Sequence, residues 1–125
     1  MEIIQLVQED TDEQAALFSA LADPTRLKLM KLLCHQRVPD AFCVNALAGL
    51  LGVTQSAVSQ HLRVLRSIGL VKGERRGYHI HYYINPEVVK HCQELASAAL
   101  SVEELTKEKL CQNCNEGRKQ NVPRK

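Results

Sequence analysis

The feature that most constrains this chain is a tight junction between two predicted helices. A helix predicted over residues 43–51 ends at Gly52, and only Val53 separates that glycine from Thr54, which can cap a following helix. Glycine readily adopts the left-handed conformation that ends helices, and threonine is a favoured N-cap residue. Two helices joined by so short a turn form a helix-turn-helix.

The second of these helices, residues 54–66, has two chemically different faces. Val58, Leu62 and Leu65 recur at i, i+4 and i+7 and form an apolar stripe. The opposite face and its flanks carry hydroxyl, amide and guanidinium groups and no carboxylate; they comprise Gln55, Ser56, Ser59, Gln60, Arg63, Arg66 and Ser67. The hydroxyl of Thr54, the capping residue, could also contact a phosphate. Such groups pair with base edges and phosphates, so we interpret this face as DNA-binding rather than as ordinary solvated surface. Ser56, Ser59, Gln60 and Arg63 are the candidates for reading bases.

An alternating pattern after Gly69 predicts a β-hairpin with strands at residues 70–74 and 78–84. Arg75 and Arg76 would lie at its tip, where they can reach a phosphate or the minor groove. Lys72, Tyr78 and His79 are further candidates for DNA contact on the same hairpin. The charge distribution agrees, because residues 54–81 contain five Lys or Arg and one acidic residue, whereas residues 1–25 contain six acidic residues and no Lys or Arg.

Three further helices complete the expected fold. A helix over residues 12–22 is expected to bury Ala15, Ala16, Phe18, Leu21 and Ala22. Asp23-Pro24 then predicts a capped start for a helix reaching residue 36, which would bury Leu27, Leu29, Met30, Leu33 and Cys34. Asn85-Pro86 starts the last helix in the same way, and a seam of small apolar residues along it predicts a homodimer interface shared with Phe18: Val88, Cys92, Leu95, Ala99 and Val102.

The fold class is therefore mainly α with a small β-hairpin, in the order α-α-α-α-β-β-α, and dimeric. We expect a flexible segment at residues 1–11, one domain at 12–105, and a basic, disordered tail at 106–125. No apolar run approaches the length of a membrane span, and the N-terminus lacks a signal pattern. These features predict a cytoplasmic protein without a membrane partner, whose five cysteines are thiols.

Three blocks of sequence resemble the ArsR/SmtB family of winged helix-turn-helix repressors. They are Ala20–Leu27, Thr54–Leu65, and Gly69-Leu70-Val71 with Arg76-Gly77-Tyr78 and Tyr82-Tyr83. Together they span about residues 12–105. The resemblance implies a homodimer that binds a palindromic operator in double-stranded DNA through two recognition helices, and an effector that releases the DNA.

The resemblance also implies two metal-binding positions, and both are altered here. The family's Cys-Val-Cys pair appears as Cys43-Val44-Asn45, and its carboxylate and imidazole positions fall on Asn85, Glu87, Ala98 and Ser101. The second set cannot build a tetrahedral zinc site.

Thiols elsewhere leave three alternatives for sensing, of which the favoured one is release of the repressor from its operator by a thiol-reactive metal or metalloid. Cys111 and Cys114 form a Cys-x2-Cys pair that Cys43 could complete into a three-thiolate site for As(III), Cd(II) or Zn(II). Cys34 and Cys92 could instead form a redox or persulfide-sensing couple, although each is also expected to be a small buried hydrophobe. The third alternative is a regulator in which no cysteine senses anything.

Two rival functional classes are weaker. A thiol enzyme using Cys111 and Cys114 is disfavoured because no strand precedes the pair. A protein-interaction module is disfavoured by the carboxylate-free face of residues 55–67. The sequence predicts a repressor and not an enzyme. His61, next to the apolar stripe, is expected to pack and hydrogen bond within the fold rather than contact DNA.

Overall fold

The computed structural model describes residues 2–37 and 41–102. The chain divides into two compact units, one made of Asp10–Ala99 and one made of the two ends, residues 1–9 and 100–125. In the unit of the two ends, helix α1 (Glu2–Gln8) lies in the segment for which the sequence predicted flexibility. The predicted tail at 106–125 lies outside the described residues.

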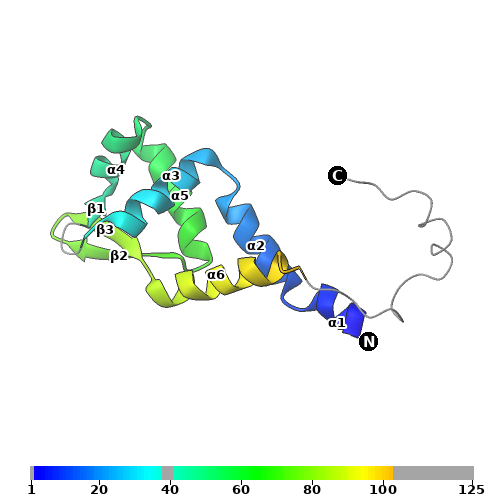
Figure 1. The fold of residues 1–125 in the computed structure, drawn as a ribbon. Coiled ribbons are helices and arrows are strands. Elements are labelled where there is room, and N and C mark those ends of the chain that lie inside the picture. The colour runs from blue at the N-terminus through cyan, green and yellow to red at the C-terminus, as the bar shows by residue number, and fades with distance from the viewer. Residues whose placement is uncertain (1, 38–40, 103–125) are drawn as a thin grey trace. The chain divides into compact units, whose positions relative to one another are not determined.

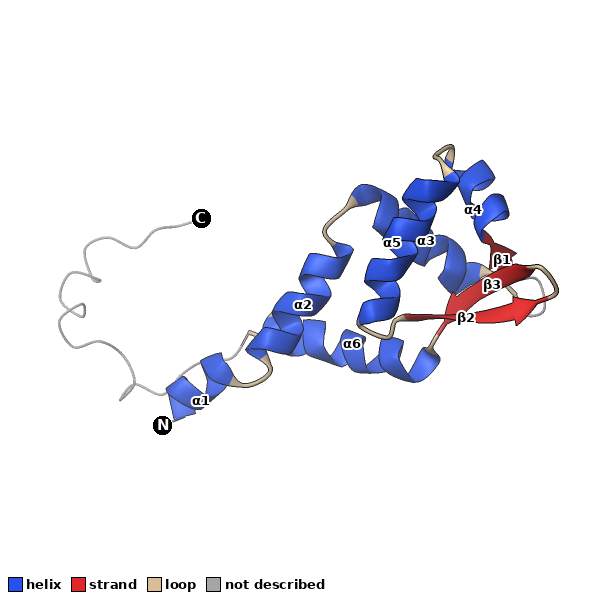
Figure 2. Cartoon of the chain, turned by 180° about the vertical axis from the view of Figure 1, so that it is seen from behind, coloured by secondary structure: helices blue, strands red, loops and turns tan. Residues whose placement is uncertain are grey.

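The unit Asp10–Ala99 combines five helices with a small sheet among the described residues (Figure 1). Its elements are α2 (Thr11–Leu21), α3 (Pro24–His35), β1 (Phe42–Cys43), α4 (Val44–Leu51), α5 (Gln55–Ser67), β2 (Val71–Arg76), β3 (His79–Ile84) and α6 (Pro86–Ala99). The strands are antiparallel in the order β1-β3-β2, and the helices gather on one side of them (Figure 2). This is a winged helix-turn-helix, as the sequence predicted, with the short strand β1 as an addition.

The predicted caps set the helix boundaries. An Asp23 carboxylate oxygen accepts the Arg26 backbone N–H at 3.0 Å, and Pro24 opens α3. The Thr54 hydroxyl accepts the Ala57 backbone N–H at 3.0 Å and so caps α5. Gly52 ends α4 at φ +69°, a left-handed conformation that disfavours residues with a Cβ. The helix-turn-helix geometry is thus encoded locally.

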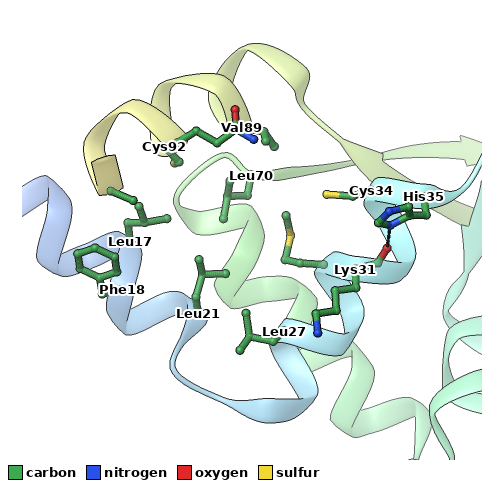
Figure 3. A pocket seen from close by; sticks show the side chains of 13 residues that line it. Leu17, Phe18, Leu21, Leu27, Lys31, Cys34, His35, Leu70, Val89 and Cys92 are labelled. Carbon is green, nitrogen blue, oxygen red and sulfur yellow. Dashed lines mark hydrogen bonds between the residues drawn. The ribbon is translucent and has the colours of Figure 1, made fainter. Parts of the chain in front are cut away.

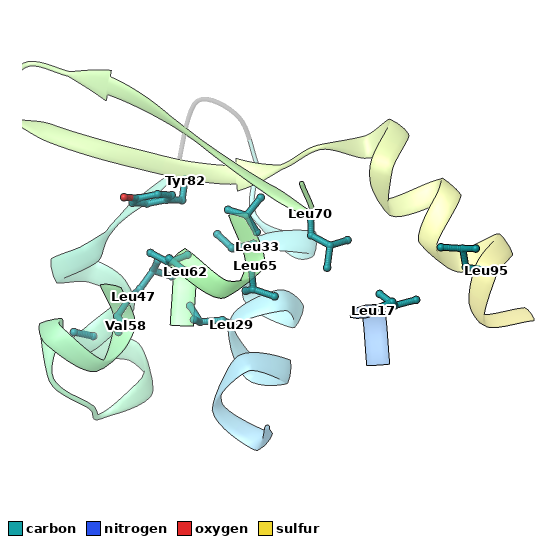
Figure 4. Close-up of a cluster of buried hydrophobic side chains, with 12 residues drawn as sticks. Leu17, Leu29, Leu33, Leu47, Val58, Leu62, Leu65, Leu70, Tyr82 and Leu95 are labelled. Carbon is teal, nitrogen blue, oxygen red and sulfur yellow. The ribbon is translucent and has the colours of Figure 1, made fainter. Parts of the chain in front are cut away.

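The core fixes α5 by its apolar side (Figure 4). Val58, Leu62 and Leu65 are at most 1% exposed, as are Leu29 on α3 and Leu47 on α4. Burying one such side chain stabilises the folded state by about 1.5–3 kcal/mol. Because all three residues of the apolar stripe are buried, the rotation of α5 about its own axis is fixed, and the opposite, polar face points away from the core.

Several predictions of buried residues in α2 and α3 were wrong. In α2 the buried residues are Leu17 and Ala20, while Leu21 is half-buried. The other side of α2 is exposed and includes Ala15, Ala16 and Phe18; Ala22, just beyond the helix, is exposed as well. In α3, Leu27 and Cys34 are exposed and Leu29 and Leu33 form the core contacts. Both helices carry apolar residues around more than one face, so composition alone could not determine which face turns inward.

The hairpin differs from its predicted form at the turn. Strand β2 continues through Arg75 and Arg76, which pair with Ile80 and His79. The turn consists of Gly77 and Tyr78 only, with Gly77 at φ +67°. A two-residue hairpin turn needs positive φ, which glycine supplies without strain. The two arginines therefore lie on a strand beside the tip, and Tyr78 occupies the tip itself.

Helix α6 begins at Pro86 as predicted and ends at Ala99. Val102 therefore lies beyond the helix, in the unit of the two ends, and is 96% exposed. Among the described residues, no helix combines the length and apolar character needed to cross a membrane.

Candidate nucleic-acid interface

The polar face of α5 is exposed along its whole length. Its exposed residues are Gln55, Ser56, Ser59, Gln60, Arg63, Arg66 and Ser67. Ser67 donates its hydroxyl to the Val64 carbonyl, whereas the Gln60 and Arg63 side chains bond to no other residue in the described part of the chain. The groups that can read base edges are therefore available to a ligand.

A polar cluster on the other side of α5 ties this helix to α2 and α3. The Arg26 guanidinium donates to the Ala20 carbonyl at 2.6 Å and lies 3.3 Å from Nδ1 of His61. Because arginine can only donate, Nδ1 of His61 is the acceptor. The Asp23 carboxylate accepts the Arg26 backbone N–H, and this hydrogen bond is the main cause that holds the pKa of Asp23 below its ordinary value. His61 bonds within the fold, as the sequence predicted.

Sequence reasoning did not identify Arg26 as part of this cluster. Arg26 and His61 are 35 positions apart, and no local pattern pairs them. The one local signal is the position of Arg26 in the first turn of a capped helix, which does not indicate a distant partner. Arg26 is a positioning residue for α5, since it joins the end of α2 to α5.

The hairpin adds a second basic element beside α5. Lys72, Arg75, Tyr78 and His79 are exposed, and Tyr78 is 98% exposed at the turn. Arg76 is half-buried and bridges to Glu74 at 3.2 Å. That ion pair partly neutralises Arg76, so Lys72 and Arg75 are the better placed cations for a polyanion.

Contacts across the hairpin orient Lys72. The Lys72 ammonium lies 5.3 Å from the centre of the Tyr83 ring, a cation–π contact. The Tyr83 hydroxyl donates to Glu74 at 3.3 Å. Desolvation first, and the Glu74 charge second, raise the pKa of Tyr83, which keeps the phenol protonated as a donor.

Cys34 and Cys92 border the same apolar pocket, although they belong to different helices. The pocket has a volume of about 320 Å³ and lies between α2, α3 and α6, with Leu70 at its side (Figure 3). Desolvation raises the pKa of both thiols, and Glu13 adds to the rise at Cys92. Oxidation proceeds through the thiolate, so these shifts make both cysteines less reactive. The prediction that Cys34 is buried was wrong, and Cys92 is half-buried.

Of the three predicted metal donors, Cys43, Cys111 and Cys114, the structure describes only Cys43. Cys43 is a half-buried free thiol on β1. Cys111 and Cys114 lie outside the described residues. Within residues 2–37 and 41–102, no group of three His, Cys, Asp or Glu side chains is arranged to hold a metal ion.

The residues predicted for a dimer interface are not equally available. Phe18 on α2 is 40% exposed and Ala99 on α6 is exposed. Val88 and Cys92 are half-buried. Leu95 is only 5% exposed, because it packs in the core of its own protomer. Leu95 therefore has little surface left for a partner.

Known proteins share this architecture. Residues 23–72 match the family described as "Bacterial regulatory protein, arsR family". A transcriptional repressor SmtB homolog from Synechocystis is 42% identical over 94 residues, which are 69% of this chain and 68% of that protein. A cadmium resistance transcriptional regulatory protein CadC from Listeria innocua is 29% identical over 91 residues, which are 73% of this chain and 74% of that protein.

A solved structure extends the comparison to three dimensions. It is the solution structure of a homodimeric winged helix-turn-helix DNA-binding domain from Mycobacterium bovis, with a TM-score of 0.57 and 26% identity; the match covers 79% of this chain and 94% of that one. The fold, the exposed polar face of α5 and the similarity in sequence all point to the same family. The chain belongs to the ArsR family and is a DNA-binding transcriptional regulator of the winged helix-turn-helix type.

Proposed function

We propose that this regulator represses transcription by placing two copies of α5 in successive major grooves of a palindromic operator. The observation that carries this proposal is the polar face of α5, which is exposed and carboxylate-free on a helix whose opposite side is locked in the core. Ser56, Ser59, Gln60 and Arg63 would contact bases. Thr54, Gln55 and Arg66, at the start and flank of that face, would contact phosphates.

The hairpin would brace this arrangement from the side. Lys72 and Arg75 would engage phosphates, with Arg76, Tyr78 and His79 at or near the turn. Such contacts add affinity that falls with salt and contribute little to base choice.

Two protomers are required to present two copies of α5. The Mycobacterium bovis domain is described as homodimeric. In this chain, Phe18 and Ala99 leave apolar surface exposed on α2 and α6, which a second copy would cover. Val88 and Cys92 would contribute their exposed edges, whereas Leu95 would support the interface from within its own protomer.

The effector we propose is a thiophilic ion such as Cd(II), Zn(II) or As(III), bound with Cys43, Cys111 and Cys114 as donors. The name of the CadC relative refers to cadmium resistance, which supports this class. A redox couple of Cys34 and Cys92 is less favoured because both thiols are held protonated. To shift the operator-binding form from 99:1 to 1:99, the effector must prefer the other form by about 5.5 kcal/mol.

The test is DNA binding as a function of salt. Wild-type protein and the Gln60→Ala/Arg63→Ala variant are titrated against an operator selected from randomised duplexes and against an unrelated duplex. We expect the wild-type affinity to fall steeply with salt and the variant to lose its preference for the operator. Affinity without a salt slope, or a variant that keeps full preference, would contradict the proposal.

A further inference from the structure

The apolar pocket between α2, α3 and α6 reaches from the core to the surface (Figure 3). Leu17 and Leu70, which line it, are at most 4% exposed and belong to the hydrophobic core. Phe18 and Leu27, which also line it, are 40% and 42% exposed. Its volume of about 320 Å³ lies within the range of small-molecule pockets, about 300–1,000 Å³, which are mostly apolar. The pocket therefore suits a small ligand with an apolar body.

Sulfur atoms in the lining keep this interior apolar. Desolvation is the first cause that raises the pKa of Cys34 and the pKa of Cys92. Both thiols are thus neutral, and a neutral thiol behaves as a small hydrophobe. Met30 adds a flexible thioether, which can adapt to the shape of an apolar ligand. Such a lining recognises a hydrocarbon through packing rather than through hydrogen bonds.

The polar part of the lining is exposed and carries positive charge. It consists of Lys31 and His35 on α3 and Gln93 on α6. The His35 Nδ1 donates to the Lys31 carbonyl at 2.8 Å, whereas the Lys31 ammonium has no ion pair or hydrogen bond to any residue in the described part of the chain. None of the described residues that line the pocket is acidic. An unpaired cation at the edge of an apolar pocket is complementary to a carboxylate that carries a hydrocarbon chain.

We propose that this pocket binds an unbranched aliphatic carboxylic acid of medium chain length, such as decanoate. The chain would pack against Leu17, Met30 and Leu70, and the carboxylate would pair with the Lys31 ammonium. A second copy of the protein that covered the pocket with apolar side chains would leave Lys31 without a counter-charge, whereas this ligand satisfies both the apolar lining and the cation. The inference concerns a site beyond those of the proposed function.

The position of the pocket connects it to α5 in two ways. Leu70 lies just after α5, where its backbone N–H donates to the Leu65 carbonyl at 3.1 Å and its carbonyl accepts from the Asn85 N–H at 2.9 Å. On the other side, α3 reaches α5 through the contact between Arg26 and His61. A ligand packed between α3, α6 and Leu70 would therefore change how α5 is held, and this consequence for DNA binding rests on the proposed function.

The first test measures binding of hexanoate, octanoate, decanoate and decanol to the full-length reduced protein. The chain has two methionines, Met1 and Met30, so NMR of ¹³C-labelled methionine methyl groups reports directly on the pocket. The Met30 signal should shift saturably, and each additional buried methylene should strengthen binding by about fourfold. Binding that leaves the Met30 signal unchanged, or an affinity that does not depend on chain length, would overturn the site.

The second test uses two matched pairs of variants. Lys31→Gln should weaken decanoate binding by about fivefold and leave decanol binding unchanged, whereas Lys28→Gln changes an exposed lysine on the same helix outside the pocket lining. Ala96→Phe should fill the pocket and abolish binding of both ligands. Ala98→Phe adds the same ring at an exposed position of α6 outside the lining. Thermal midpoints show which variants are folded, and the lysine pair decides if Ala96→Phe is not.

The outcomes separate this site from the proposed function. Equal decanoate affinities in Lys31→Gln and Lys28→Gln would overturn the role of Lys31. A folded wild-type protein that binds none of these acids would overturn the proposal, and weaker dimerisation of Ala96→Phe would then assign the pocket to the second copy. Operator binding by the ligand-free protein tests the proposed function by itself, and an unchanged operator affinity at saturating decanoate would overturn the connection to α5.

Discussion

The Arg26 guanidinium lies 3.3 Å from Nδ1 of His61, which is half-buried, and so links α3 to α5, the helix that we propose binds DNA. The same guanidinium donates to the Ala20 carbonyl at the end of α2. Apolar packing fixes how α5 rotates about its axis, whereas this directional contact fixes α5 relative to α2. Since α2 also belongs to the proposed dimer interface, the contact connects that interface with the helix that we propose binds DNA.

A double-mutant cycle can measure this contact. We expect His61→Ala and Arg26→Gln to be coupled by about 1 kcal/mol in the free energy of unfolding, the size of one hydrogen bond to a charged group in a partly exposed site. Urea denaturation of the wild type, both single variants and the double variant gives the coupling. Additive effects within about 0.3 kcal/mol would show that the two side chains do not interact in solution.

Arg63→Ala should lower specificity and leave stability unchanged. A bidentate arginine–guanine contact contributes about 1–3 kcal/mol of discrimination, so the preference for operator should fall by about 5- to 150-fold. Arg63 is exposed, and its side chain bonds to no described residue, so the thermal midpoint should stay constant. Fluorescence anisotropy and thermal melting measure the two effects, and an unaltered preference would remove Arg63 from the base-reading set.

Arg75→Ala should weaken binding to every DNA sequence, because a phosphate contact does not depend on the bases. Each lost phosphate contact reduces the slope of log K against log salt by about 0.9. The slope should therefore become shallower for operator and unrelated duplex alike. Lys90→Ala serves as a control, because Lys90 is exposed on α6 outside the hairpin. Equal slopes in both variants would exclude Arg75 from phosphate contact.

Two glycines near the helix-turn-helix should respond to alanine with opposite signs. Gly52 has φ +69° and open space where a Cβ would lie, so Gly52→Ala should destabilise the protein by about 1 kcal/mol through backbone strain alone. Gly49 lies inside α4, also with open space, so Gly49→Ala should stabilise by about 0.5–1 kcal/mol. Thermal or urea unfolding compares the two, and changes of the same sign would contradict the assigned turn.

Asp23 should make the free energy of unfolding depend on pH in the acidic range. The Arg26 backbone N–H is the main cause that lowers the pKa of this carboxyl from 3.8. The folded state thus binds the proton less readily than the unfolded state, so the stabilisation is complete above the unfolded pKa and is lost as pH falls through the folded pKa. Asp23→Asn retains a capping side chain without titrating there. Unfolding free energies between about pH 5 and pH 2 should fall more steeply for the wild type than for this variant.

Local signals in the amino-acid sequence were enough to define the boundaries and the buried side of α5. Gly52, Thr54, Asp23 and Pro86 mark helix ends through their own backbone and capping preferences, which need no distant partner. The spacing of Val58, Leu62 and Leu65 likewise identified the buried side of α5, and therefore its polar face. The position and orientation of this helix could be predicted for that reason.

Packing of the folded chain selected which residues meet when they are distant in sequence. α2 and α3 have apolar residues on more than one side, so only packing against other elements selected Leu17 over Phe18 and Leu29 over Leu27. Strand β1 is two residues long and exists through pairing with β3. Helix packing brings Arg26 to His61, and the register of β1 against β3 brings Cys43 opposite His81. The members of each pair are tens of residues apart, so the spacing of residues in the sequence could not predict that they meet.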